Sequence, residues 1–263
     1  MNRERQDLIL KYLEKTQQAG IGEISQNFGV SIATARRDLD ELSQLGKLQR
    51  VHGGALFIQK APPELPIFQR QAEQAQEKAQ IGAAAARLIL DGETIFLASG
   101  TTTLEITRHL DQFQHLTVYT NSLMIINRLA NNPNINLVAI GGQYRISEYV
   151  FYGYLVERAL SELSIDKVFI GFRAISIEQG FTNDFLPELT TDRAILKSGK
   201  EIIVLADHTK FNRISTTLVA PLTTAHRIIT DNLAPEEFIS KLREKGIDVI
   251  VAPTNILKEN FER

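Results

Sequence analysis

Two adjacent arginines, Arg36 and Arg37, follow small and hydroxyl side chains in an arrangement that suits contact with DNA. Arginine can pair in bidentate fashion with guanine or with phosphate, and small hydroxyl residues can approach bases or backbone closely. From this run alone, a merely solvated helix surface is as good an interpretation as DNA binding. The residues that we predict to contact DNA are Ser31, Ala33, Thr34, Arg36, Arg37, Lys47, Arg50 and His52.

A second set of polar residues follows successive apolar runs in the rest of the chain. The clearest member is Ser99-Gly100-Thr101-Thr102-Thr103, where a glycine lets backbone N–H groups turn toward a ligand and hydroxyls add donors. A following helix would present its positive end, so the loop predicts an anion site, with phosphate as the expected anion. Taken singly, such a loop is more often only a helix cap. The later members are Thr120-Asn121-Ser122, Gly141-Gly142-Gln143-Tyr144-Arg145, Gly171-Phe172-Arg173 and Asp207-His208-Thr209-Lys210.

Three short helices and a hairpin are predicted to position the DNA-binding residues. Apolar residues at helical spacing indicate helices around 8–13 and 21–28, and Gly29 can end the second of these. Ser31 is a preferred N-cap for a third helix, which Gly46 stops. Strands at 48–51 and 55–58 flank His52-Gly53-Gly54, whose glycines supply the positive φ that a tight hairpin needs. This order of elements predicts a winged helix-turn-helix.

A mostly parallel sheet is predicted to gather the second set of polar residues. Short apolar runs separated by helix-length segments are typical of strands buried on both faces. In such a sheet the loops after the strands meet at the carboxyl edge, where ligands bind. The runs that we predict as strands are 94–98, 116–119, 137–140, 167–170, 202–205 and 227–230.

A proline-containing stretch separates these two parts of the chain. Pro62, Pro63 and Pro66 favour extended backbone and cannot continue either a wing or a helix. We therefore expect a DNA-binding domain at 1–58, a linker at 59–76 and an effector-sensing α/β domain at 77–263.

Composition narrows the class of protein. The 263 residues include no cysteine, which excludes disulfides and thiolate metal sites and is consistent with a reducing cytoplasm. The formal net charge of −2 argues against a chain coated with basic residues, so DNA affinity must come from a local patch. No segment approaches the ~20 apolar residues of a membrane span. We expect a cytoplasmic protein without a cofactor, a metal site or a membrane anchor.

The N-terminal motifs resemble those of the DeoR family of bacterial transcription regulators. In that family a helix of pattern V-S-x-x-T-x-R-R-D-L is followed by a wing that ends in H-G-G-A. The chain carries Val30-Ser31, Thr34 and Arg36-Arg37-Asp38-Leu39, then His52-Gly53-Gly54-Ala55. The match departs only at Ala35, an inward position where the family usually has isoleucine.

The rest of the chain resembles the sensor domain of the same family, which is similar to sugar-phosphate isomerases. This resemblance implies binding of a phosphorylated sugar, with the 99–103 loop on the phosphate and Asn121, Arg145 and Lys210 around the remainder. Family members often have aspartate in place of Ala98 and lysine in place of Asp192. If those positions contact the hydroxyls of the effector, the effector of this protein or its mode of binding differs from the usual one. Arg173, Asn183 and Asp184 are candidate compensating groups.

The predicted function is a ligand-responsive transcription regulator, expected to repress carbohydrate genes as a homo-oligomer on a double-stranded operator. The alternative is a sugar-phosphate isomerase with an appended DNA-binding module, for which Asp184, Glu188 and Asp207 are possible bases. A sensor that reads a protein partner is a third interpretation. We assign no catalytic residue. The predicted effector residues are Ser99, Gly100, Thr101, Thr102, Thr103, Asn121, Ser122, Gly141, Gly142, Arg145, Arg173, Glu188, Asp207 and Lys210.

Overall fold

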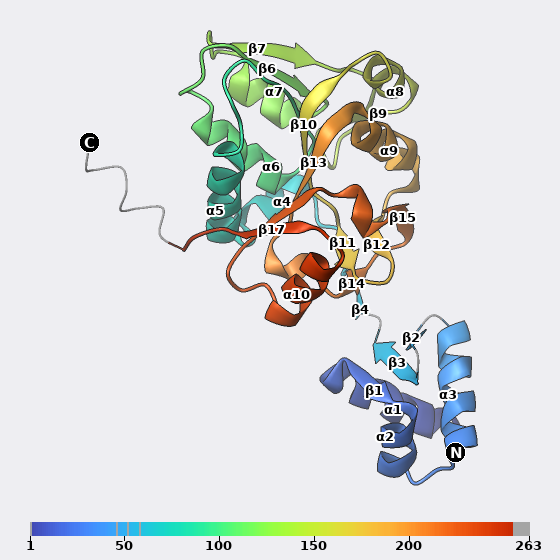
Figure 1. Ribbon diagram of the computed structural model, residues 1–263. Coiled ribbons are helices and arrows are strands. Elements are labelled where there is room, and N and C mark those ends of the chain that lie inside the picture. The colour runs from blue at the N-terminus through green and yellow to red at the C-terminus, as the bar shows by residue number, and fades with distance from the viewer. Residues whose placement is uncertain (1, 46, 52, 58, 255–263) are drawn as a thin grey trace. The chain divides into compact units, whose positions relative to one another are not determined.

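The computed structural model describes residues 2–45, 47–51, 53–57 and 59–254, and it divides into two compact units (Figure 1). The first unit is Met1–Lys60 and the second is Ala61–Arg263. The predictions for Gly46, His52 and Ile58 lie outside the described residues. No helix in the described part of the chain combines the length and apolar character needed to cross a membrane.

The first unit is a winged helix-turn-helix, as the sequence predicts. Ile9, Leu13, Ile24, Leu39 and Leu42 form its core. The hairpin pairs in the expected antiparallel sense, and a third short strand, which the sequence did not reveal, joins it along β3. The elements are α1 (Asn2–Thr16), β1 (Gln18–Gly20), α2 (Ile21–Asn27), α3 (Ile32–Gln44), β2 (Leu48–Val51), β3 (Gly54–Phe57) and β4 (Gln59–Lys60).

The second unit is built on a seven-stranded sheet of order β17-β16-β13-β10-β5-β6-β7, in which all neighbours are parallel. The strands predicted from apolar runs are all present, and β17 is an addition. Their bounds are β5 (Thr94–Leu97), β6 (Leu116–Thr120), β7 (Ile135–Ala139), β10 (Ile165–Ile170), β13 (Gly199–Leu205), β16 (Arg227–Thr230) and β17 (Asp248–Val251).

Helices cover both faces of this sheet, which explains the continuous apolar runs. Along β10, Val168 packs into the core beside α8, α9 and α10, while Phe169 packs into the core beside α5, α6 and α7. Figure 1 shows α5, α6 and α7 on one side of the strands and α8 and α9 on the other. The helices are α4 (Ile67–Ala72), α5 (Ala75–Ala86), α6 (Thr101–Ile106), α7 (Leu123–Leu129), α8 (Tyr154–Leu160), α9 (Leu189–Ser198) and α10 (Glu236–Glu244).

The second unit also has short strands and 3₁₀ turns outside the central sheet. A hairpin formed by β8 and β9 and a small antiparallel sheet of order β11-β12-β15 were not predicted. Their bounds, with β14 and the turns, are β8 (Gln143–Arg145), β9 (Val150–Tyr152), β11 (Ala174–Ser176), β12 (Gly180–Asn183), β14 (Arg213–Ile214), β15 (Thr217–Ala220), η1 (Thr107–His109), η2 (Leu186–Glu188), η3 (His208–Lys210) and η4 (Leu222–Thr224).

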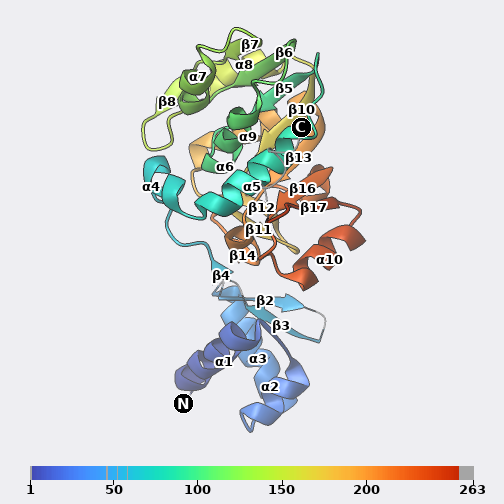
Figure 2. The ribbon, with the colours of Figure 1, turned by 90° about the vertical axis from the view of Figure 1, so that its left-hand side faces the viewer.

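Most of the segment predicted as a linker is packed into the second unit. We call residues 61–73 the strap. Its Ile67 side chain is only 1% exposed, and the Ile67 N–H donates to the Ser147 carbonyl over 3.0 Å. Figure 2 shows α4 of the strap beside the β8–β9 hairpin. The compact units therefore meet at Lys60 and Ala61, in place of the predicted linker at 59–76.

Candidate functional site

Helix α3 presents the two arginines that the sequence singled out. Ser31 caps the helix, because its Oγ accepts from the Thr34 N–H at 3.2 Å. Leu39 lies on the buried face, whereas Arg36 and Arg37 are exposed. Ser31 and Ala33 are also exposed and Thr34 is half-buried, so the predicted contact residues of α3 share an accessible surface near the helix N-terminus.

The aspartate that follows the arginines points inward and fixes the helix. Asp38 is 1% exposed, and both of its carboxylate oxygens accept from Arg5 of α1, at 2.6 and 2.9 Å. This bidentate pair joins the first helix of the unit to the third. The surface of α3 is thereby held in orientation by a charged contact behind it.

One of the predicted DNA-contacting cations of the wing has partners within the unit. Lys47 is exposed, but Arg50 forms an ion pair with Asp40 at 2.8 Å and donates to the Gly54 carbonyl at 2.7 Å. Arg50 is therefore engaged within the unit, where it braces the hairpin against α3. His52, the remaining wing residue of the prediction, lies outside the described residues.

The second unit has an open pocket at the point where the strand order reverses. From β5 the chain proceeds to β6 and β7 on one side, and then returns to β10 on the other. A reversal of this kind leaves a crevice at the carboxyl ends of the two central strands, which is where open α/β sheets bind ligands. The pocket, including its mouth, encloses about 1010 Å³ of empty space, and the loops after β5 and β10 line it.

Most of the predicted effector residues meet in this pocket. Those that line it are Ser99, Gly100, Thr101, Thr102, Thr103, Asn121, Arg145, Arg173, Glu188 and Lys210. The candidate compensating groups also line it: Asn183 donates to Asp192 at 2.7 Å, and Asp184 lies 3.3 Å from Arg173.

The remaining predicted residues have structural roles beside the pocket. Ser122 caps α7, and Gly142 is a packing glycine, since a Cβ there would lie 2.7 Å from the Tyr152 carbonyl oxygen. Gly141 does not line the pocket, and no atom would meet a Cβ there within 4 Å. Asp207 is fully buried, accepts from the Thr209 N–H at 3.0 Å and lies 3.9 Å from the Lys210 ammonium.

One end of the pocket is cationic. Lys78 is 4% exposed and its Nζ donates to the Arg70 carbonyl at 2.5 Å. Burial lowers the pKa of both Lys78 and Lys210, and the charge of Lys210 lowers that of Lys78 further. On the adjoining loop the Thr103 hydroxyl is fully buried and has no hydrogen-bond partner among the described residues. This end can take an anion with charge-assisted hydrogen bonds.

The other end of the pocket is rich in carboxylates. Glu64 lies 3.3 Å from Arg70 and 3.7 Å from Arg145, and Arg145 also lies 3.3 Å from Glu188. Glu148 forms an ion pair with Arg70. Burial raises the pKa of Glu148 to about 7, despite the opposing charge of Arg70.

Carboxyl and amide oxygens at this end remain free to accept hydrogen bonds. Oδ1 of Asn121 and Oε1 of Glu188 are buried and have no partner in the described part of the chain. Burial also raises the pKa of Asp192 to about 7. Among the described residues, no cluster of three or more histidine or carboxylate side chains is placed to hold a metal ion. The acceptors therefore suit hydroxyl donors.

The sequence reading missed the contribution of the strap and of the β8–β9 hairpin. Glu64, Arg70, Lys78 and Glu148 line the pocket, but three of them lie in or just after the segment predicted as a linker. The one sequence feature that could have indicated these pocket residues is the presence of two cations, Arg70 and Lys78, in a glutamine-rich run. Sequence alone could not place that run over the carboxyl edge of the sheet.

Comparisons with known proteins agree on both units. Residues 5–61 match the DeoR-like helix-turn-helix domain, and residues 73–232 match the DeoR C terminal sensor domain. The transcriptional repressor AccR of Agrobacterium fabrum is 32% identical over 93% of this chain and 96% of its own. The regulator IolR of Bacillus subtilis is 34% identical over 88% of this chain and 92% of its own.

A solved structure aligns with part of this chain at low sequence identity. Ribose 5-phosphate isomerase A from Methanocaldococcus jannaschii aligns with 51% of this chain and 53% of its own, at 18% identity and a TM-score of 0.38.

Proposed function

Because the chain belongs to the DeoR family of transcription regulators, we propose that its second unit binds a phosphorylated sugar and thereby controls occupancy of an operator. DNA-binding transcription regulation is the activity of the family. The sign of that regulation, the effector and the assembly are the parts proposed for this chain. We propose repression, which the name of the relative AccR supports.

The observation that carries the effector proposal is the cationic end of the pocket. A buried hydroxyl without a partner, on Thr103, is costly unless a ligand accepts its hydrogen bond. Two lysines of lowered pKa, Lys78 and Lys210, line the pocket with it. A phosphate group supplies an acceptor for the Thr103 hydroxyl and a negative charge beside the two lysines.

The carboxylate-rich end supports a polyhydroxylated remainder for the effector. Asn121 Oδ1 and Glu188 Oε1 are acceptors without partners, and sugar hydroxyls are donors of suitable size. Arg145 packs its guanidinium 4.1 Å from the centre of the Phe185 ring, which holds one wall of this end in place. A phosphorylated sugar fits both ends at once.

The ion pairs and positions of the three acidic residues considered as catalytic bases favour a sensor over an isomerase. Glu188 is paired with Arg145, Asp184 with Arg173, and Asp207 does not line the pocket. Proton abstraction beside a carbonyl needs a base within hydrogen-bond reach of the substrate. These acids are engaged as partners of arginines or as supports of Lys210.

A screen of matched sugars tests the effector proposal. Purified full-length protein is heated with ribose or ribose 5-phosphate, and with glucose or glucose 6-phosphate, and the melting temperature is recorded. We expect only phosphorylated members to raise it. Lys210→Ala and Thr101→Ala should each cost about tenfold or more in effector affinity, because a charge-assisted bond contributes roughly 1.5–3 kcal/mol.

The matched control is Lys197→Ala, which removes an exposed lysine of α9 and should leave effector affinity unchanged. Equal binding of phosphorylated and unphosphorylated sugars would contradict the phosphate assignment. Isomer interconversion followed by NMR, and abolished by Glu188→Gln, would replace the sensor with the isomerase.

A further inference from the structure

We propose that the strap, residues 61–73, transmits effector binding to the DNA-binding unit, because the effector phosphate competes for the arginines that hold the strap on the pocket. The inference rests on the proposed function, since it requires an anion in the cationic end. The strap is the element that would move, and its contacts with arginines of the pocket are those that would break.

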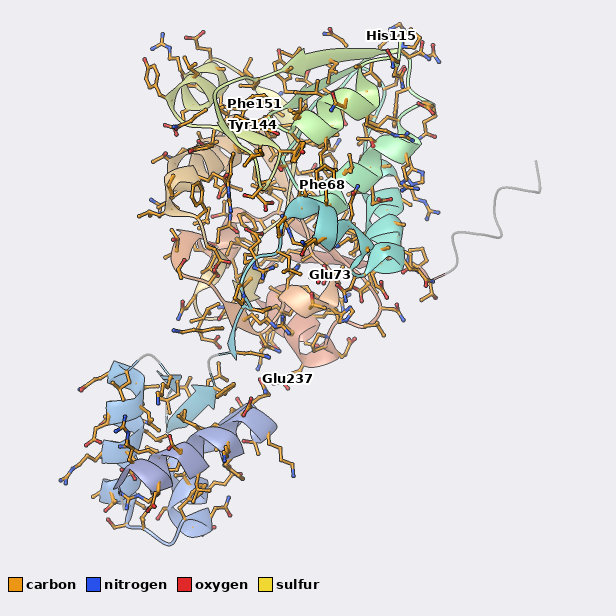
Figure 3. The ribbon with its side chains drawn as sticks, turned by 180° about the vertical axis from the view of Figure 1, so that it is seen from behind. Phe68, Glu73, His115, Tyr144, Phe151 and Glu237 are labelled. Atoms are coloured by element: carbon orange, nitrogen blue, oxygen red, sulfur yellow. The ribbon has the colours of Figure 1, made fainter. Side chains whose placement is uncertain are left out.

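The strap has the right connections for this role. It begins at Ala61, directly after the last residue of the first unit, and its residues Glu64, Arg70 and Glu73 line the pocket. Figure 3 shows Phe68 on α4 near Tyr144 and Phe151 of the β8–β9 hairpin, with Glu73 just beyond α4. A change in the pocket therefore reaches the DNA-binding unit through a single covalent segment.

Arg173 ties the first residues of the strap to the sheet. Its Nη2 donates to the carbonyl oxygen of Pro63 at 3.0 Å and also to that of Pro62. Both acceptors are neutral carbonyls, and a phosphate oxygen is a stronger acceptor for a guanidinium. An anion within reach of Arg173 would therefore draw it away from the strap.

Glu64 pairs with one arginine of the strap and with one outside it. Its carboxylate bridges Arg70 at 3.3 Å and Arg145 at 3.7 Å, and its side chain is 19% exposed. The charges of Arg173, Arg70 and Glu64 all act on Lys210, raising or lowering its pKa. The strap arginine and its carboxylate partner are thus within electrostatic range of the cationic end, and a bound dianion repels Glu64 while it attracts Arg70.

The later part of the strap is also held by apolar contacts, which a phosphate does not touch. Ile67 is buried, and the Phe68 and Tyr149 rings pack edge to face with centroids 4.6 Å apart. Release is therefore confined to residues 62–66, because α4 stays on the hairpin and the Ala61 N–H donates to the Ile214 carbonyl at 2.9 Å. By linkage, whatever loosens residues 62–66 must also favour effector binding.

Spin labelling of the full-length chain tests the proposal, and the absence of cysteine makes it direct. A nitroxide is attached at Leu65→Cys in the loosening part or at Gln69→Cys on α4, both exposed positions. Spectra are recorded with and without inorganic phosphate. We expect phosphate to increase the mobility of the label at residue 65 and to leave residue 69 unchanged.

Glu64→Ala and Glu244→Ala form the matched pair of variants. Both remove one carboxylate, but Glu64 bridges two arginines of the pocket, whereas Glu244 is an exposed residue of α10 that does not line it. Glu64→Ala should mobilise residue 65 without phosphate and bind phosphate about threefold more tightly, because partly exposed ion pairs contribute about 0.2–1 kcal/mol. Glu244→Ala should behave as the parent protein.

The outcomes separate the two proposals. Phosphate binding that depends on Lys210 but leaves residue 65 immobile would overturn the strap and keep the effector site. Equal behaviour of Glu64→Ala and Glu244→Ala would also contradict the proposed role of the strap. No phosphate binding at all would overturn both.

Discussion

Adjacent residues of α3 have different roles, one in DNA binding and the other in stability, and substitutions should distinguish the two. Arg36 and Arg37 are exposed, whereas Asp38 is buried against Arg5. We expect Arg36→Ala or Arg37→Ala to weaken operator binding by ~1–3 kcal/mol at fixed salt, without lowering the melting temperature. Asp38→Ala should instead reduce the unfolding free energy of the first unit by about 1.5–3 kcal/mol, because it removes the charged hydrogen bonds that join α1 to α3.

Measuring this contrast requires a cognate DNA site, obtained by selection from random double-stranded oligonucleotides. Fluorescence anisotropy then gives affinity, and urea denaturation gives stability. Lys15→Ala, which removes an exposed cation of α1, serves as the control for non-specific charge loss. Unchanged affinity in both arginine variants would remove α3 from the recognition role.

A second prediction at the residue scale concerns pH and Asp192. Burial raises the pKa of its carboxyl from 3.8 to about 7, so the folded protein keeps this proton at pH values where the unfolded chain has lost it. The corresponding stability is complete below pH ~4 and is lost as pH rises to about 7. Asp192→Asn stays neutral, so its stability relative to the parent should increase from pH 5 to pH 8.

Urea denaturation of both proteins at the two pH values measures that difference directly. Other titrating groups cancel, because they are common to parent and variant. A stability difference that stays constant with pH would show that Asp192 ionises normally in the folded protein.

At the scale of elements, the contact between α5 and α6 sets the position of the phosphate loop. A Cβ at Gly82 of α5 would lie 2.6 Å from Glu105 Cβ and 2.8 Å from the Glu105 carbonyl carbon on α6. Gly82→Ala should therefore push α6 and its leading loop away from Lys78. We expect a loss of about 1–2 kcal/mol in unfolding free energy, since overpacking outweighs the gain in helix propensity.

The same variant should bind phosphate more weakly, as measured by thermal shift. Gly141→Ala is the control, because no atom would meet its added Cβ within 4 Å. If Gly82→Ala matched this control in both stability and phosphate affinity, the α5–α6 contact would not position the loop.

The sequence predicts those helices and strands whose pattern of apolar residues reflects which of their faces are buried. The central strands are continuous apolar runs because helices cover both faces of the sheet. The start of α3 could be predicted because Ser31 is a preferred N-cap residue. The short strands β1, β8 and β9 carry no such pattern, since each forms only three residue pairs with its neighbour in the ladders of β1 with β3 and of β8 with β9. The loops after β5 and β10 could be placed at one edge, but the strap that covers them could not.

The misreading of the strap has a definite physical origin. Its prolines and polar residues are what an exposed connector would have, and its one buried anchor is Ile67. The interactions that fold it down come from Arg145, Glu148 and Arg173, which lie far along the chain. Local composition cannot reveal charge pairs across such separations.

At the scale of the whole molecule, we expect the protein to bind DNA as a dimer or a larger assembly. One winged helix offers few base contacts, and two-fold heads on a near-palindromic site multiply the selectivity. Light scattering at micromolar concentration, with and without the selected DNA, measures the assembly. A monomer under both conditions would contradict the prediction.

The boundary between Lys60 and Ala61 also matters to anyone building hybrid regulators from this chain. A designer who cut at the end of the polar run, near residue 76, would give the strap to the wrong parent. The new sensor would then lack the carboxylate and the arginine that close its own ligand site, and the transplanted strap would meet foreign partners. Exchange of DNA-reading heads between relatives should preserve ligand response only when residues 61–73 travel with the sensor.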